Sequence, residues 1–170
     1  MGLNGSINWL SKESRPDLAC QTNQNQQCLP NPTVGQIRNA NAVVRRAKQF
    51  SDISLTYQSI PVSHLKATLH TDASKNNAVK GGTQAGYITG MTNGLLSRGN
   101  VAPWSPLVWK SFRLKRVVES TLGGETQICM DGLGHLEWIL CHFALALDPT
   151  FDLNNRTPKL QRFESQVIID

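Results

Sequence analysis

The feature that most limits the fold of this chain is a change of hydrophobic period near residue 52. Before it, apolar residues recur at roughly helical spacing. After it, Ile53, Leu55 and Tyr57 alternate with polar residues. Spacing of three to four residues is typical of helices, and alternation is typical of strands. A helical pattern returns at residues 121–147, and a β-branched run occupies residues 166–170. The chain therefore contains helices and strands in separate blocks.

The first 50 residues predict three helices. Pro16 and Asp17 suit the first turn of the second helix, because proline is tolerated there and a carboxylate favours the positive helix end. Thr33 can cap the third helix after two breaking prolines. We expect the third helix to bury four aliphatic residues, Val34, Ile37, Val43 and Val44.

Residues 51–170 predict four strands, one long helix and a last strand. We expect strands at residues 53–57, 65–71, 85–91 and 107–109, with a polar loop after Asp72. Ser120 or Thr121 can cap a helix that ends before Asp148-Pro149. Its expected buried stripe is Ile128, Leu133, Leu136, Leu140 and Phe143. Antiparallel strands followed by a crossover helix and a parallel strand indicate an α/β fold with an N-terminal helical segment.

Three carboxylates occupy positions in the sequence where they could take part in catalysis. We expect Asp72 and Asp170 at the ends of strands and Glu125 in the first turn of the long helix, so that the three can converge. Clustered carboxylates repel one another unless cations are present, and Mg²⁺ prefers oxygen ligands. Each acid also has a structural interpretation, as a turn residue, a helix N-terminal acid or a chain end.

The charge of the chain is unevenly distributed. The net charge is +5, yet residues 66–118 hold eight Lys or Arg and one Asp. Residues 119–170, by contrast, hold three Lys or Arg and eight Asp or Glu. A nuclease typically has cations that bind phosphates close to carboxylates that bind a metal ion. The alternative is that these charges cluster by chance on solvated faces.

Other features exclude some classes of protein. There is no run of about 18 apolar residues, so we expect no membrane span. The N-terminus lacks the basic start and apolar core of a secretory signal. The four cysteines form no C-x-x-C pair and have no histidine at zinc-site spacing. We therefore expect free thiols in a reducing compartment, the cytoplasm or the nucleus.

Short motifs, in order along the chain, resemble a copia-type retrotransposon polyprotein. The segments LHTDAS at residues 69–74, QAGYI at 84–88, STLGGE at 120–125 and VIID at 167–170 resemble its ribonuclease H-like domain, as does the tryptophan- and lysine-bearing stretch at 103–116. Residues 2–10, 15–19, 31–33 and 43–46 resemble the end of its reverse transcriptase.

The resemblance implies a truncated ribonuclease H-like mixed sheet at residues 51–170, after a helical remnant of reverse transcriptase at residues 1–50. It implies that Asp72, Glu125 and Asp170 hold two Mg²⁺ ions for hydrolysis of RNA in RNA–DNA hybrids. The implied partners are such hybrids or other nucleic acid, and the remainder of the Pol polyprotein. Three cations are candidate phosphate contacts or simply solvated residues, namely Arg113, Lys115 and Arg116.

Three departures from the family lead us to expect weak or no activity. The polymerase motif Tyr-x-Asp-Asp is absent, and the family's fourth downstream carboxylate would fall after Asp170. Gly123 and Gly124 also replace better helix formers just before Glu125. Two alternatives stay open: a non-catalytic nucleic-acid-binding relic, and a gene-model product that folds poorly.

Two smaller expectations concern residues near these acids. We expect Trp104 and Trp109 to pack in the core or at the sheet edge rather than to stack on bases. We expect Asp131 to face solvent, because it lies six residues after Glu125 and on a different helix face.

Overall fold

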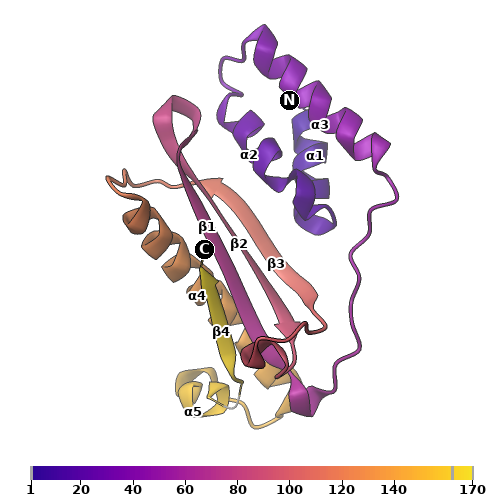
Figure 1. Ribbon diagram of the computed structural model, residues 1–170, viewed down its shortest axis with the longest axis vertical. Coiled ribbons are helices and arrows are strands. Elements are labelled where there is room, and N and C mark those ends of the chain that lie inside the picture. Colours follow the sequence, from indigo (N-terminus) through magenta and orange to yellow (C-terminus); the bar gives the residue numbers. More distant parts are fainter. Residues whose placement is uncertain (1, 162, 170) are drawn as a thin grey trace. The chain divides into compact units, whose positions relative to one another are not determined.

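A computed structural model describes residues 2–161 and 163–169, so Asp170 lies outside the described residues. The helices are α1 (Gly2–Glu13), α2 (Ala19–Gln27), α3 (Val34–Gln49), α4 (Thr121–Leu147) and α5 (Thr157–Leu160). The strands are β1 (Lys66–Ala78), β2 (Gly82–Thr92), β3 (Ser105–Arg113) and β4 (Ser165–Ile169) (Figure 1). The predicted α/β fold class is confirmed.

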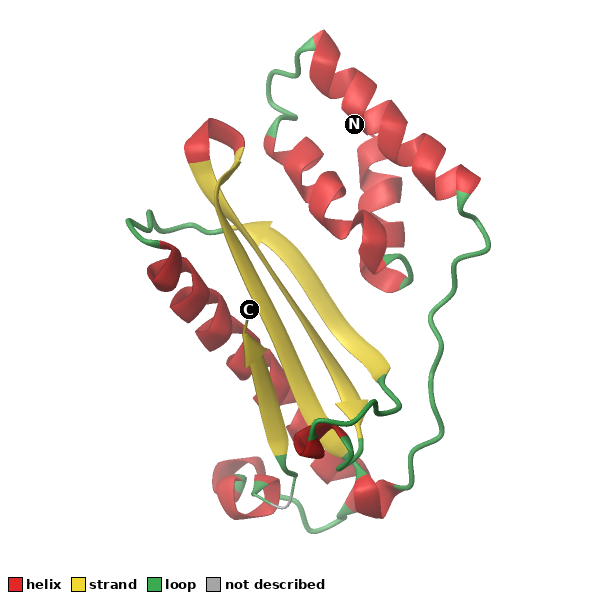
Figure 2. Cartoon of the chain, viewed as in Figure 1, coloured by secondary structure: helices red, strands yellow, loops and turns green. Residues whose placement is uncertain are grey.

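The strands form one mixed sheet in the order β3-β2-β1-β4 (Figure 2). A turn of only three residues joins β1 to β2, and such a short connection requires an antiparallel pair. β4 follows α4 and pairs with β1 in parallel, with Ala67 opposite Ser165 and Thr71 opposite Ile169. The predicted order of antiparallel strands, crossover helix and parallel strand is therefore present.

The predicted strand at residues 53–57 is wrong. The structure has no regular element there, and the side chains of Ile53 and Tyr57 are exposed. Alternation of polar and apolar residues forms a strand only where a neighbouring strand takes up its backbone hydrogen bonds.

The predicted loop after Asp72 is also wrong. β1 continues to Ala78 and turns through Val79–Gly81, where Lys80 and Gly81 have φ values of 57° and 70°. Pairing with β2 outweighs the low strand propensity of the intervening Ser, Lys and Asn residues. Asp72 consequently lies in the interior of a 13-residue strand and not at its end.

The chain divides into two compact units, each built from separate segments. Unit 1 comprises Met1–Leu55, Ala73–Gly86 and Trp109–Gly124. Unit 2 comprises Thr56–Asp72, Tyr87–Val108 and Glu125–Asp170. A domain boundary between residues 50 and 51 stays a prediction.

The three predicted helices of unit 1 are present, but one predicted helix face is wrong. Thr33 caps α3 as predicted, in a reciprocal capping box with Gln36. Val43 is buried, whereas Val34 and Ile37 are 68% and 51% exposed. The less exposed face of α3 consists of Gln36, Ala40, Val43, Val44 and Ala47, so alanines take the place of the predicted Val34 and Ile37.

Arg15 joins the end of α1 to the end of α3. Its buried guanidinium donates from Nε and Nη2 to the two carboxylate oxygens of Asp17, at 2.7 and 2.9 Å. Nη1 donates to the carbonyl oxygen of Phe50 at 2.8 Å and to that of Ala47 at 3.4 Å, where α3 ends. The hydrogen bond from Arg15 lowers the pKa of Asp17 below its ordinary value.

Carboxamides connect α2 to the strands of unit 1. Gln27 donates to the side-chain oxygens of Asn23 and Gln84, at 2.8 and 2.9 Å, and accepts from the backbone N–H of Val79. The buried Gln84 also donates to Ser111 Oγ at 3.0 Å. Asn23, Gln24 and Gln27 of the polar run at residues 22–27 therefore face the strands.

In unit 2, α4 packs on β1 through a glycine. Ile128, Leu136 and Leu140 are buried as predicted, but Leu133 is 37% exposed, so that part of the predicted stripe is wrong. A Cβ at Gly132 would lie 2.7 Å from Leu69 Cδ1, and Leu69 is fully buried. The missing side chain at Gly132 therefore sets the close approach of the helix to the sheet.

Gly132→Ala is expected to lower the free energy of unfolding by about 1–2 kcal/mol, because the added methyl must displace a packed leucine. Gly134→Ala is the matched control on the same helix, since nothing lies within 4 Å of a Cβ there. That control should stabilise the protein by about 0.5–1 kcal/mol, because alanine favours helix. Urea denaturation measures both, and equal effects of the same sign would contradict the close approach.

Trp104 packs within unit 2, as predicted. Its Nε1 donates to Thr68 Oγ1 at 2.8 Å, and its ring meets the edge of His70 with centroids 5.9 Å apart. Trp109, in unit 1, donates to the carbonyl oxygen of Ser11 at 2.7 Å. Both indole N–H groups are therefore used inside the protein, and both residues are half-buried. None of the helices in the described part of the chain combines the length and apolarity needed to cross a membrane.

Candidate functional site

Asp72 lies on the face of β1 opposite to α4. The side chain of Leu69 meets α4 at Gly132, and His70 meets Trp104. Successive side chains of a strand point to opposite faces. Asp72 therefore shares the face of His70, where it is exposed to solvent.

Glu125 lies near the start of α4, as predicted. The residue is half-buried and its Oε2 atom is buried. Asp131 is exposed, as predicted. The third predicted ligand, Asp170, lies outside the described residues, and the described ladder between β1 and β4 ends at Thr71, one residue before Asp72.

The described residues do not by themselves form a magnesium site. Within residues 2–161 and 163–169, no three His, Cys, Asp or Glu side chains are grouped so that they could hold a metal ion. Helix α4, which carries Glu125, packs on the face of β1 opposite to the one that bears Asp72. Metal binding by Asp72, Glu125 and Asp170 stays a prediction.

The three predicted phosphate-binding cations lie in unit 1. Arg113 ends β3, and Lys115 and Arg116 follow it in the loop before α4; all three are exposed. The guanidinium of Arg113 lies against Gly82 at the start of β2. The structure therefore brings the end of β3 and the β1–β2 hairpin together within unit 1.

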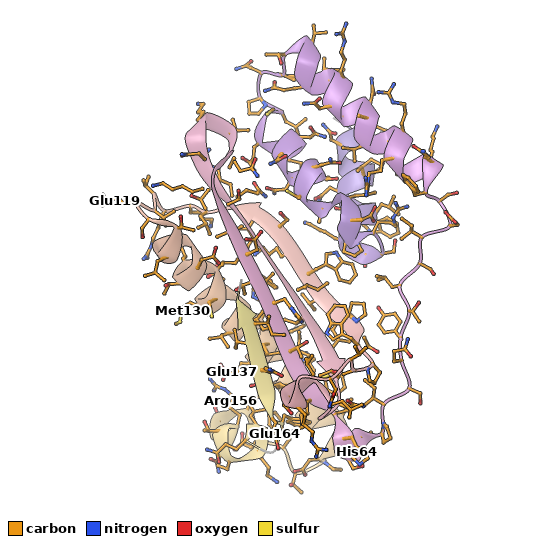
Figure 3. The ribbon with its side chains drawn as sticks, in the orientation of Figure 1. His64, Glu119, Met130, Glu137, Arg156 and Glu164 are labelled. Carbon is orange, nitrogen blue, oxygen red and sulfur yellow. The ribbon has the colours of Figure 1, made fainter. Side chains whose placement is uncertain are left out.

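The sequence analysis missed two cations of this hairpin. Lys75 is exposed on β1, and its Nζ donates to the carbonyl oxygen of Glu119, which Figure 3 labels in the loop before α4. Lys80 is exposed at the tip of the hairpin. The Gly81-Gly82 pair, a common turn signal, could have indicated the hairpin.

We use the name basic surface for five exposed cations of unit 1, which lie on the β1–β2 hairpin, at the end of β3 and in the loop that follows β3. It consists of Lys75, Lys80, Arg113, Lys115 and Arg116. No described acid forms a salt bridge with any of them. In unit 2, by contrast, Arg156 pairs with Glu137 at 2.7 Å (Figure 3), and Lys159 pairs with Asp148 at 2.6 Å. The hydrogen bonds of Lys159 and Thr150 lower the pKa of Asp148 well below its ordinary value.

The two units carry opposite net charge. Among the described residues, unit 1 holds twelve Lys or Arg and four Asp or Glu, a net charge of +8. Unit 2 holds four and seven, a net charge of −3. A surface of one sign attracts ligands of the opposite sign and raises their rate of association.

Comparison with models of known protein families and with curated proteins finds no match. The function must therefore be argued from the residues of this chain.

Proposed function

We propose that this chain binds nucleic acid through the basic surface of unit 1, as a ribonuclease H-like module of a copia-type retroelement polyprotein. The observation that carries the proposal is the net charge of +8 on unit 1, with five exposed cations that no described acid neutralises. Nucleic acid is the polyanion that such a surface suits best, because each contact between a cation and a phosphate releases a condensed counterion.

The topology supports the ribonuclease H-like part of the proposal. Three antiparallel strands, a crossover helix and a strand parallel to the first are the arrangement that the motif resemblance implies. We therefore take an RNA–DNA hybrid as the ligand to test first, and the remainder of the Pol polyprotein as the physiological context.

The proposal is tested by replacing Arg113, Lys115 and Arg116 with glutamine. Fluorescence anisotropy with a labelled RNA–DNA hybrid, repeated over a series of salt concentrations, measures the affinity and its salt slope. Each lost phosphate contact should make the slope shallower by about one, so the triple variant should lose about two to three. Its affinity at moderate salt should fall at least about tenfold.

Arg98→Gln is the matched control. Arg98 is also exposed, and no described acid forms a salt bridge with it, but it belongs to unit 2. It should leave the affinity and the salt slope close to those of the unchanged protein. Absent binding, binding insensitive to salt, or an equal loss in both variants would contradict the basic surface as the binding site.

A second candidate function is metal-dependent hydrolysis of the RNA strand of RNA–DNA hybrids, with Asp72, Glu125 and Asp170 as ligands of Mg²⁺. Two observations favour it: Glu125 has a buried carboxylate oxygen near the start of α4, and the strand that bears Asp72 pairs in parallel with β4. We rank metal-dependent hydrolysis below nucleic-acid binding because Asp72 points away from α4, which carries Glu125.

Cleavage of a labelled hybrid with and without Mg²⁺ tests the nuclease. Asp72→Asn should abolish any magnesium-dependent cleavage, while Asp131→Asn, an exposed acid of α4, should leave it unchanged. Cleavage that Asp72→Asn does not reduce would exclude the assigned ligand.

A further inference from the structure

A polar cavity of about 520 Å³ lies within unit 1, between α2, α3 and the β1–β2 hairpin. Its volume falls in the range of small-molecule sites. Six carboxamide residues contribute to its wall, together with Arg46, Cys28 and a few apolar atoms. The six are Gln21, Gln24, Asn25, Gln36, Asn39 and Asn77.

Helical spacing concentrates these carboxamides on the faces of α2 and α3 that line the cavity. Gln21, Gln24 and Asn25 lie on α2, and Gln36 and Asn39 lie on α3. Side chains three or four positions apart lie on the same helix face. Gln21 and Asn39 are exposed and Asn25 is half-buried, so these carboxamides are open to solvent and to a ligand.

Only part of this polar capacity is used inside the protein. Gln24 donates to the carbonyl oxygen of Asn77 at 2.9 Å, and Gln36 belongs to the capping box of α3. The side chains of Gln21, Asn25 and Asn39 form no hydrogen bond with another side chain or backbone group among the described residues. Their donors and acceptors are available to a ligand.

Carboxamides match the edges of nucleobases. Each side-chain amide of Asn or Gln offers two donors and an acceptor, the pattern that reads unpaired base edges. Arg46 supplies a cation in the same wall; its side chain is 47% exposed and its Nε lies 3.6 Å from Asp17 Oδ2. Asn77 and Val79 of the wall lie between Lys75 and Lys80 in the β1–β2 hairpin.

We propose that this cavity receives one unpaired base of a nucleic acid whose phosphates bind the basic surface. A neutral ligand such as a sugar would also match the carboxamides, but the charge of +8 on unit 1 and the cation in the cavity wall select a nucleotide. The inference rests on the proposed nucleic-acid binding and adds a preference for single-stranded bases to it.

The test compares two RNA–DNA hybrids with the same short single-stranded extension. In one probe the extension carries its bases, and in the other it is abasic, so both carry the same phosphates. The unchanged protein should bind the probe with bases about tenfold more tightly, as expected for a recognised base. Asn25→Ala combined with Asn39→Ala should remove this preference and leave the salt slope unchanged.

The variants are chosen to keep the fold intact. Alanine is a better helix former than asparagine, so both substitutions should preserve α2 and α3, and thermal denaturation checks this. Gln49→Ala is the control, because Gln49 is an exposed carboxamide of α3 outside the cavity wall. It should retain the preference for bases.

The outcomes separate the two proposals. Equal affinity for both probes, or a preference that survives in the Asn25→Ala, Asn39→Ala variant, would overturn the base-binding cavity and leave phosphate binding standing. Failure of both probes to bind would overturn the proposed function together with the cavity.

Discussion

Asp17→Ala is expected to lower the free energy of unfolding by about 3 kcal/mol. Arg15 has only 6% of its side chain exposed, and Asp17 is the only described carboxylate that pairs with it. The Asp17 side chain, by contrast, is 22% exposed. Removal of Asp17 leaves the buried guanidinium without a compensating charge, and such a loss in a fully buried pair typically costs about 3–5 kcal/mol. The lower end applies here, because the carbonyl oxygen of Phe50 still accepts from Arg15.

Urea denaturation of the two proteins measures this loss. Glu13→Ala serves as the control, because Glu13 is an exposed acid two residues before Arg15 at the end of α1. A carboxylate is unfavourable at a helix C-terminus, so this control should change stability by less than about 0.5 kcal/mol. If Asp17→Ala and Glu13→Ala lower the free energy of unfolding by the same amount, the ion pair between Arg15 and Asp17 does not stabilise unit 1.

The contribution of Asp17 should also depend on pH. Because its pKa is lower in the folded protein than its ordinary value of 3.8, folding favours the ionised carboxylate. The stabilisation is present above pH 3.8 and is lost as the pH falls through the lower folded-state pKa. The stability difference between the unchanged protein and Asp17→Ala should therefore shrink in acid, and a constant difference would contradict the assignment.

Gly90→Ala is expected to destabilise the protein by about 3 kcal/mol. A Cβ at this position would lie 2.5 Å from Nε1 and 2.6 Å from Cζ2 of Trp104. The indole must move, so the substitution adds an overpacking cost of about 1–3 kcal/mol to the loss of the hydrogen bond from Nε1 to Thr68. Thr68 is fully buried, so its hydroxyl cannot turn to solvent in compensation.

Gly94→Ala provides the comparison for Gly90→Ala. Gly94 lies just after β2, and a Cβ there would make only ordinary contact with Lys66, at 3.4 Å. Its effect on the thermal midpoint should be small. A Gly90→Ala variant that unfolds at the same temperature as the Gly94→Ala variant would show that Trp104 does not depend on this glycine.

Local signals in the sequence predicted the elements whose ends they mark. The capping residue Thr33, the helix from Thr121 to Leu147 and the parallel strand after it all appear where expected. A cap, a following Asp-Pro pair and a β-branched run act within a few residues, so each can be identified without knowledge of the rest of the fold.

The candidate site was less predictable from the sequence. Asp72, Glu125 and the three cations were identified as residues, but their faces and neighbours were not. The length of β1 depends on pairing with β2, and that pairing fixes which face Asp72 occupies. The same hairpin places Lys75 against the loop before α4 and Gly82 against Arg113 at the end of β3.

The sequence alone thus established the fold class, the succession of three helices, antiparallel strands, long helix and last strand, and the excess of positive charge, but it also predicted a strand at residues 53–57 that the structure lacks. The tertiary structure decided the orientation of Asp72, the assembly of the basic surface and the polar packing of α2. The physical reason is range: propensity and capping act between near neighbours in the chain, whereas strand pairing and side-chain burial depend on residues far apart in it.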